Sequence, residues 1–131
     1  MQSQKETSIT ARSLVSVVDD DESVRESLPD LLREFGFAAI SFSSAEEFLS
    51  SDSVDETQCL VLDIAMPGMS GLDLQQQLEQ SGQRIPIVFM TAHKDQAIQS
   101  RAFKHGAASL LLKPFSDTAL FEAVKAALDG K

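Results

Sequence analysis

The sequence lacks a second cysteine, a long apolar run and a surplus of basic residues. With Cys59 as its single cysteine, the chain has no disulfide framework, which suits the reducing cytoplasm. No apolar run approaches the roughly 18 residues of a membrane span, and the N-terminus lacks the apolar stretch of a secretion signal. We therefore expect a cytoplasmic protein that has no membrane partner.

Basic residues are outnumbered by acidic ones, 11 Lys and Arg against 20 Asp and Glu, which gives a net charge of -9. A chain this negative is repelled by nucleic acid and by anionic lipid. If the protein controls a gene, we expect the DNA to be contacted by an output domain that this chain does not contain.

The length of 131 residues and the apolar share of 43% predict a single domain with one sizeable core. Residues 1–13 are polar and without periodicity, so we expect a flexible N-terminal arm there. We assign residues 14–128 to the domain and residues 129–131 to a tail or the start of a linker.

Short apolar segments alternate with segments of helical period along the domain. The apolar segments predict strands at 14–18, 38–42, 59–62, 85–90 and 109–112. The helical segments include one from Val24 to Phe35, which contains Pro29, and one from Gln96 to Lys104. This alternation predicts an α/β fold, a doubly wound five-stranded parallel sheet with helices on both faces in a three-layer sandwich.

Polar side chains follow four of the predicted strands. Asp19 and Asp20 end the first strand, Asp63 the third, Thr91 the fourth and Lys113 the fifth. The carboxyl ends of parallel strands line one edge of the sheet, where ligands bind at the switch in strand order. We therefore expect these side chains to converge on one crevice.

Three carboxylates in one crevice repel each other, and a like-charge pair 4 Å apart costs about 4 kcal/mol at an effective dielectric constant near 20. The crevice must therefore hold a proton or bind a cation. Oxygen ligands suit Mg²⁺, whereas the sequence has no Cys/His cluster for zinc. With Lys113 as a positive charge and Thr91 as a hydroxyl donor, the crevice predicts phosphoryl transfer to an aspartate.

Four segments resemble the signature segments of response-regulator receiver domains of two-component signalling: VVDDDESVRESL, LDIAMPGMSGLDL, FMTAH and LLLKPF. The resemblance covers about residues 13 to 128. Within the family, the chain is most similar to receivers that precede the helix-turn-helix output of nitrogen-fixation regulators. The resemblance implies the flavodoxin-like strand order 2-1-3-4-5.

The resemblance also implies roles for individual residues. Asp63 would accept a phosphoryl group from a sensor histidine kinase, Asp20 would bind Mg²⁺ directly, and Asp19 would act mainly through water. Asp63 itself and the backbone carbonyl of Ala65 would complete the protein's metal ligands. Thr91 and Lys113 would each contact a phosphoryl oxygen.

The resemblance further implies a cis peptide bond between Lys113 and Pro114, and a switch made of Thr91 and the residue three positions before the lysine. That residue is usually Tyr or Phe in the family but is Leu110 here, so the aromatic form of the switch is absent. The resemblance implies that the helix at 96–104 and the strand at 109–112, with Phe103 and Leu110, belong to the face that family members use for dimerisation or partner docking, so a phosphorylation-dependent homodimer would form there. Ordinary amphipathic packing accounts for this face equally well.

An alternative function is a haloacid-dehalogenase-type phosphohydrolase with Asp19 as the nucleophile, because Asp19-Asp20-Asp21 fits the Asp-x-Asp spacing of those enzymes. The short chain disfavours it, and it leaves Asp63 and its Met-Pro-Gly loop unexplained. A flavin electron carrier is disfavoured because the acidic residues after the first strand would repel a phosphate. We therefore predict a signalling domain that assists phosphoryl transfer onto its own aspartate, rather than an enzyme.

Overall fold

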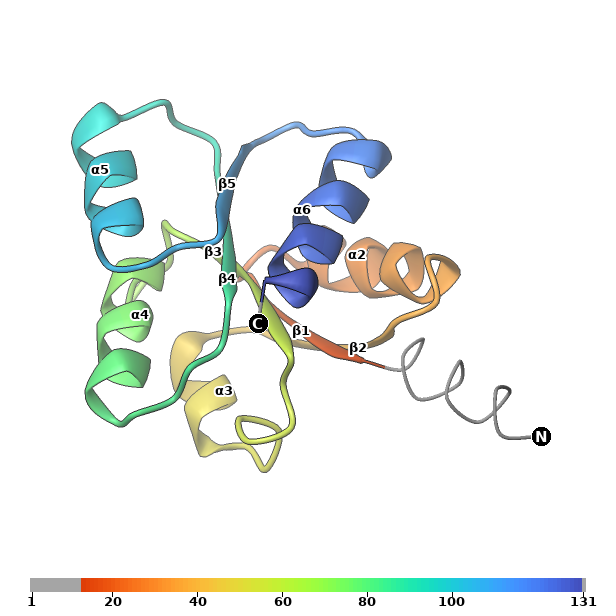
Figure 1. Ribbon diagram of the computed structural model, residues 1–131, viewed down its shortest axis with the longest axis horizontal. Coiled ribbons are helices and arrows are strands. Elements are labelled where there is room, and N and C mark those ends of the chain that lie inside the picture. The colour runs from red at the N-terminus through yellow and green to blue at the C-terminus, as the bar shows by residue number, and fades with distance from the viewer. Residues whose placement is uncertain (1–12, 131) are drawn as a thin grey trace.

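The computed structural model describes residues 13–130 and shows a five-stranded parallel sheet in the order β2-β1-β3-β4-β5 (Figure 1). The strands are β1 (Leu14–Val18), β2 (Ala38–Phe42), β3 (Cys59–Asp63), β4 (Ile87–Thr91) and β5 (Ser109–Leu112). The helices are α2 (Glu22–Glu34), α3 (Ala45–Ser50), α4 (Gly71–Gln80), α5 (Gln96–Lys104) and α6 (Asp117–Asp129). The predicted α/β class and flavodoxin-like strand order are confirmed.

The helices divide between the two faces of the sheet. Helices α2 and α6 cover one face, and α3, α4 and α5 cover the other (Figure 1). Each strand carries side chains of both layers, and β3 shows this most clearly. Its Cys59 and Val61 belong to the core beneath α2 and α6, whereas Leu60 and Leu62 belong to the opposite core.

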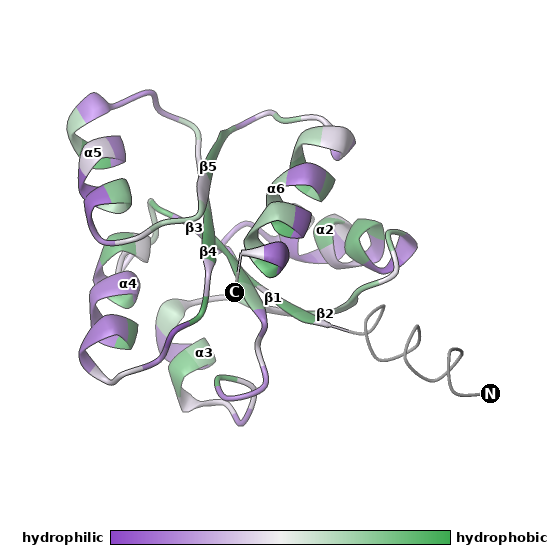
Figure 2. Cartoon of the chain, in the orientation of Figure 1, coloured by the Kyte–Doolittle hydropathy of each residue, from purple (hydrophilic) through white to green (hydrophobic). Residues whose placement is uncertain are grey.

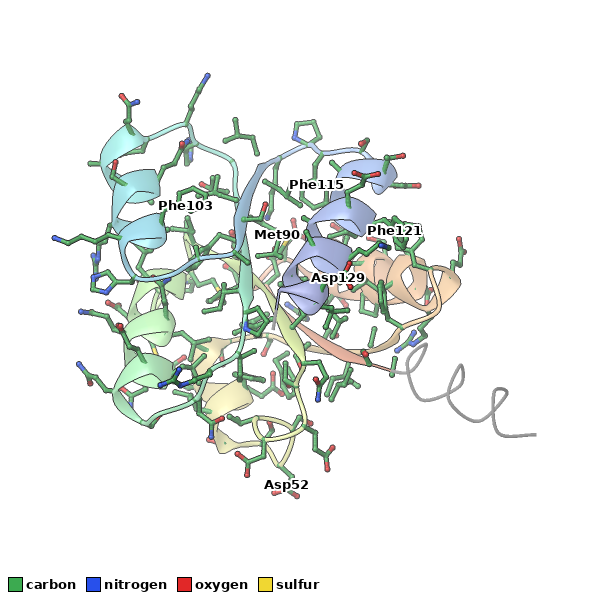
Figure 3. All side chains as sticks on the ribbon, in the orientation of Figure 1. Asp52, Met90, Phe103, Phe115, Phe121 and Asp129 are labelled. Atoms are coloured by element: carbon green, nitrogen blue, oxygen red, sulfur yellow. The ribbon has the colours of Figure 1, made fainter. Side chains whose placement is uncertain are left out.

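Burial on both faces explains why the strands are almost continuously apolar, since no position of β3 faces water. The hydropathy colouring shows apolar and polar residues mixed along the helices (Figure 2), and the buried apolar ones of each helix pack in one of the two cores. On the α2 and α6 side, Phe121 packs against Phe35 with a ring-centroid distance of 4.9 Å (Figure 3). The three-layer sandwich therefore buries its apolar residues in two cores that the sheet separates.

Pro29 lies inside α2 and is buried. A proline has no backbone N–H, so the carbonyl of Arg25, four residues earlier, loses its usual helical donor. The Ser41 hydroxyl of β2 donates to that carbonyl at 3.4 Å. The neighbouring strand thus supplies the hydrogen bond that the proline removes.

Several predicted boundaries differ by one or two residues: β3 ends at Asp63, β4 ends at Thr91, and α2 spans Glu22–Glu34. Strand β4 begins at Ile87 rather than at residue 85, because Pro86 has no N–H for a strand ladder. Ser13, assigned to the arm, accepts a hydrogen bond from the Ala38 backbone N–H at 3.1 Å and so extends the β1–β2 pairing. Asp129, assigned to the tail, is the last residue of α6.

The rest of the predicted arm, residues 1–12, lies outside the described residues, as does Lys131. Between residues 13 and 130, no helix combines the length and the apolar character that crossing a membrane requires.

Candidate functional site

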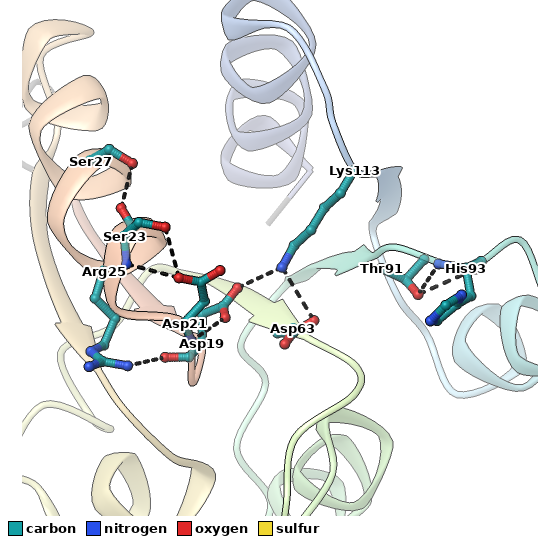
Figure 4. Close-up of polar contacts among 9 residues, drawn as sticks. All are labelled: Asp19, Asp21, Ser23, Arg25, Ser27, Asp63, Thr91, His93 and Lys113. Atoms are coloured by element: carbon teal, nitrogen blue, oxygen red, sulfur yellow. Dashed lines mark hydrogen bonds and ion pairs between the residues drawn. The ribbon is translucent and has the colours of Figure 1, made fainter.

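The candidate site lies where β1 and β3 are neighbours and their following helices leave toward opposite faces of the sheet. The chain passes from β1 to α2 on one face and from β3 to α4 on the other. In doubly wound sheets a divergence of this kind makes a crevice at the carboxyl edge, where ligands usually bind. Asp19, Asp63 and Lys113 meet there (Figure 4).

Three carboxylates come together as predicted. Oxygen atoms of Asp19, Asp20 and Asp63 lie within 4.8 Å of one another. Asp19 is fully buried and Asp63 is 6% exposed, whereas Asp20 is exposed to solvent. The crevice therefore has two acids in its floor and one at its mouth.

Asp19 is held on both sides of its carboxylate. Its Oδ2 accepts a hydrogen bond from the Lys113 Nζ at 3.0 Å, and its Oδ1 accepts one from the backbone N–H of Asp21 at 2.9 Å. The Arg25 guanidinium donates to the backbone carbonyl of Asp19 at 3.0 Å. These contacts stabilise a charge that burial alone would make very costly.

The Asp63 carboxyl group has a pKa raised from 3.8 to about 6. Burial is the largest cause, and the negative charge of Asp19 adds to it. The Lys113 ammonium lies 3.7 Å from Asp63 Oδ1 and acts in the opposite direction, as does the backbone N–H of Ala65. The ionised form of Asp63 is therefore destabilised by its burial and by the neighbouring negative charge.

Lys113 directly follows β5, and its peptide bond to Pro114 is cis, as the sequence resemblance implied. Its own backbone N–H donates to the Thr91 carbonyl at 2.8 Å. Burial alone would lower the pKa of Lys113, but the hydrogen bond to Asp19 and the charge of Asp63 raise it. Lys113 is therefore a stable positive charge between two carboxylates.

Thr91 is the last residue of β4 and is buried. Its hydroxyl accepts from the His93 N–H at 3.2 Å and lies 3.3 Å from the His93 carbonyl, to which it donates (Figure 4). Leu110, on the adjacent strand, packs against the core that contains Phe89. Thr91 thus ends the strand beside the one that Asp63 ends, with its hydroxyl engaged by its own loop.

The loop after Asp63 contains two features that the sequence analysis missed. Gly71 begins α4, and a Cβ atom there would lie 2.3 Å from the Asp63 carbonyl oxygen, so no side chain fits. Its N–H donates to the Ile64 carbonyl at 2.9 Å. The Glu46 carboxylate of α3 accepts from the Met69 N–H at 3.1 Å. Only the Pro and Gly content of this loop gave a sequence signal.

The donor set matches a hard divalent cation. Carboxylate oxygens of Asp19, Asp20 and Asp63 provide negative charge, and Ala65, two residues beyond Asp63, is exposed at the mouth of the crevice. Mg²⁺ is commonly bound by one or two carboxylates and several waters, which a crevice open at Asp20 permits. These residues therefore fit the ion that the sequence predicted.

Comparison with known families agrees with this geometry. A family model described as "Response regulator receiver domain" matches residues 15–125, which is most of the chain. The chain therefore belongs to the response regulator receiver family, a family of signalling domains.

Individual relatives carry regulatory names. The chain is 46% identical over 123 residues to Nodulation protein W of Bradyrhizobium diazoefficiens, covering 94% of this chain and 54% of that protein. It is 43% identical over 114 residues to the transcriptional regulatory protein FixJ of Azorhizobium caulinodans, covering 87% of this chain and 54% of that protein. The chain thus spans about half the length of these curated relatives.

Among solved structures, the response regulator StyR superposes with a TM-score of 0.82 at 49% identity, covering 88% of this chain and 59% of that one. The predicted membership of the receiver family is confirmed, and FixJ is among the relatives that the chain matches.

Proposed function

We propose that Asp63 accepts a phosphoryl group from a sensor histidine kinase, and that this modification controls an output outside this chain. The observation that carries the proposal is the position of the Lys113 ammonium, 3.0 Å from Asp19 and 3.7 Å from Asp63, beside a cluster of three carboxylates. Phosphoryl transfer to an aspartate needs a nucleophile, a cation site and a fixed positive charge close together, and this arrangement supports assigning those roles.

Asp63 is suited to act as the nucleophile. With a pKa raised to about 6, the carboxyl group is still mainly ionised at neutral pH, as a nucleophile must be. One Asp63 oxygen forms a bond to phosphorus while the bond from phosphorus to the donor histidine nitrogen breaks. The electron pair of that bond leaves with the imidazole, and an aspartyl phosphate remains.

Other residues stabilise the group that arrives. Asp20 and Asp63, the Ala65 carbonyl, and Asp19 mainly through water, would hold Mg²⁺. When bound, this ion supplies positive charge that offsets the charges of the carboxylates and the phosphoryl oxygens. The Lys113 ammonium, already facing Asp63, pairs with one phosphoryl oxygen.

Thr91 and Leu110 form the proposed switch. To donate to a phosphoryl oxygen, the Thr91 hydroxyl must give up its contacts with the His93 backbone. Leu110 is partly buried on the neighbouring strand and changes rotamer when Thr91 moves. Phosphorylation thereby biases two states of the domain.

The switch leads toward α5 and β5. Phe103 of α5 and Leu112 of β5 are large apolar side chains that are 50% and 39% exposed, so this face can support a phosphorylation-dependent homodimer. We place the protein in the cytoplasm and assign DNA contact to a separate output domain, because relatives about twice as long include transcriptional regulators.

The test is Asp63→Asn, with labelling by acetyl phosphate in Mg²⁺ buffer followed by mass spectrometry. We expect the unaltered protein to gain the mass of one phosphoryl group at Asp63 and the variant to gain none. A variant that still turns over phosphate esters would favour the hydrolase alternative with Asp19 as nucleophile.

A further inference from the structure

The loop from Ile64 to Ser70 connects Asp63 to α4 and carries the Ala65 carbonyl that the proposed function assigns to the metal. Its two ends are tied together, because the Gly71 N–H donates to the Ile64 carbonyl at 2.9 Å. The Ile64 N–H also donates to the Met90 carbonyl of β4 at 3.0 Å. The middle of the loop is held in a different way.

The Met66 side chain is buried in the core beneath α3 and α4, whereas Pro67 and Gly68 are exposed. Directly after them, the backbone N–H of Met69 donates to Glu46 Oε2 of α3 at 3.1 Å, although the two residues are 23 positions apart. A glutamate side chain on another element thus holds the backbone of the loop.

Gly68 has no side chain to crowd this approach. Its φ of 74° lies in the left-handed region that glycine adopts readily. A Cβ atom at this position would lie 2.9 Å from the same Glu46 Oε2 that accepts the Met69 hydrogen bond. The Glu46 carboxylate therefore lies directly against the backbone of the loop at Gly68 and Met69.

The backbone of Glu46 is anchored by its neighbours in α3. It lies in the first turn of α3, where Ala45 before it and Phe48 after it are fully buried. The N-cap Ser44 holds this turn by accepting from the Glu47 N–H at 3.0 Å. The backbone of Glu46 is therefore fixed relative to the core, while its carboxylate and the hydrogen bond from Met69 lie at the surface.

From these contacts we infer that Glu46 is a positioning residue for the cation site. Its hydrogen bond to Met69 holds residues 65–69, and with them the Ala65 carbonyl, at the position that a divalent cation beside Asp63 requires. This inference rests on the proposed function, because the cation site is part of it. Outer partners of metal ligands commonly act in this way.

The test is a Mg²⁺ titration of the metal-free protein, followed by backbone amide chemical shifts, for the unaltered chain and for Glu46→Ala, Glu46→Gln and Glu34→Ala. Glu46→Ala removes the acceptor, so we expect its Kd for Mg²⁺ to rise roughly two- to tenfold. Glu46→Gln keeps an acceptor oxygen and should restore most of the affinity. Glu34→Ala removes an exposed glutamate of α2 and should leave the Kd unchanged.

Hydrogen exchange at the Met69 amide provides an independent readout, and we expect faster exchange in Glu46→Ala than in Glu46→Gln. A Kd in Glu46→Ala equal to that of the unaltered chain would overturn the inference, because Glu46 would then support the fold alone. Equal losses in Glu46→Ala and Glu46→Gln would overturn it too, since charge would then be the cause.

Phosphoryl labelling of Asp63 is measured on the same samples. A chain that binds Mg²⁺ but takes no label counts against the proposed function and not against the role of Glu46, which the titration and the exchange rates decide.

Discussion

The five parallel strands begin at one edge of the sheet and end at the other. The two edges differ in whether their charged side chains are buried or in contact with water. The carboxyl edge buries Asp19 and Asp63 beside Lys113. The amino edge has a groove of about 630 Å³ lined largely by uncharged residues such as Leu78, Ile85 and Ala127. There His105 Nδ1 lies 3.3 Å from Glu79 Oε1, and both side chains are in contact with water.

This contrast shows where the fold carries electrostatic strain. At the amino edge, charges remain solvated and cost little. At the carboxyl edge, burial and the charge of Asp19 raise the pKa of Asp63 to about 6, so the folded protein is less stable when Asp63 is ionised. Binding a cation or a phosphoryl group at this edge can relieve that strain.

The largest effect should come from Lys113→Gln, which removes the positive charge that faces both buried carboxylates. We expect the rate of Asp63 phosphorylation by acetyl phosphate to fall roughly 10²-fold, as when one preorganised electrostatic contact is lost. Lys125→Gln, which alters an exposed pair with Asp129 in α6, is the matched control. Equal rates for the two variants would contradict the role of Lys113.

Asp63→Asn should stabilise the fold. Because the pKa of Asp63 is raised from 3.8 to about 6, the folded state binds a proton more tightly than the unfolded state. Stability is therefore lost as pH rises through that window. In Mg²⁺-free buffer above the window, we expect the variant to gain about 1–3 kcal/mol in the free energy of unfolding.

Urea unfolding across pH measures this gain, which should disappear near the ordinary pKa of aspartate. Asp52→Asn changes an exposed acid of the α3–β3 loop and serves as the control. A gain of equal size at acidic and neutral pH would show that charge repulsion is not its cause.

Asp20→Asn should affect cation binding more than folding, because Asp20 is exposed. We expect the Kd for Mg²⁺ to rise roughly tenfold or more, while the stability of the metal-free protein stays close to that of the unaltered chain. Isothermal titration and thermal unfolding measure the two quantities. Glu22→Gln, in the first turn of α2, is the control, and an equal rise in Kd there would point to general charge rather than ligation.

The smallest effect belongs to the amino edge. Glu79→Gln removes the charge that faces His105, and we expect the free energy of unfolding to change by less than about 0.5 kcal/mol, as is usual for solvated pairs. The Asp63 phosphorylation rate should not change. A large loss of either quantity would mean that the two edges are coupled.

Much of this arrangement was predictable from the order of residues. Asp63 and Thr91 end buried strands, and the carboxyl ends of parallel strands must meet at one edge. Lys113 directly follows β5, so it lies at the same edge. Their convergence needs no knowledge of side-chain packing, which is why sequence pattern was sufficient.

Contacts that depend on the path of a loop were not predictable. The Met69 N–H donates a hydrogen bond to the Glu46 carboxylate, 23 positions away in the sequence, next to a turn at Gly68. The hydroxyl of Ser41 can donate a hydrogen bond to the Arg25 carbonyl only because β2 packs beside α2. Nothing in the local sequence of either residue indicates its partner.

The close approach at Gly71 has a practical consequence for anyone who needs an inactive form of this domain. A methyl group there would press on the main chain of Asp63 while every charged side chain of the crevice kept its identity. Gly71→Ala would therefore alter the backbone next to Asp63 without changing any acid or the lysine. Such a variant would separate the contribution of the backbone path to phosphorylation from that of the charged side chains.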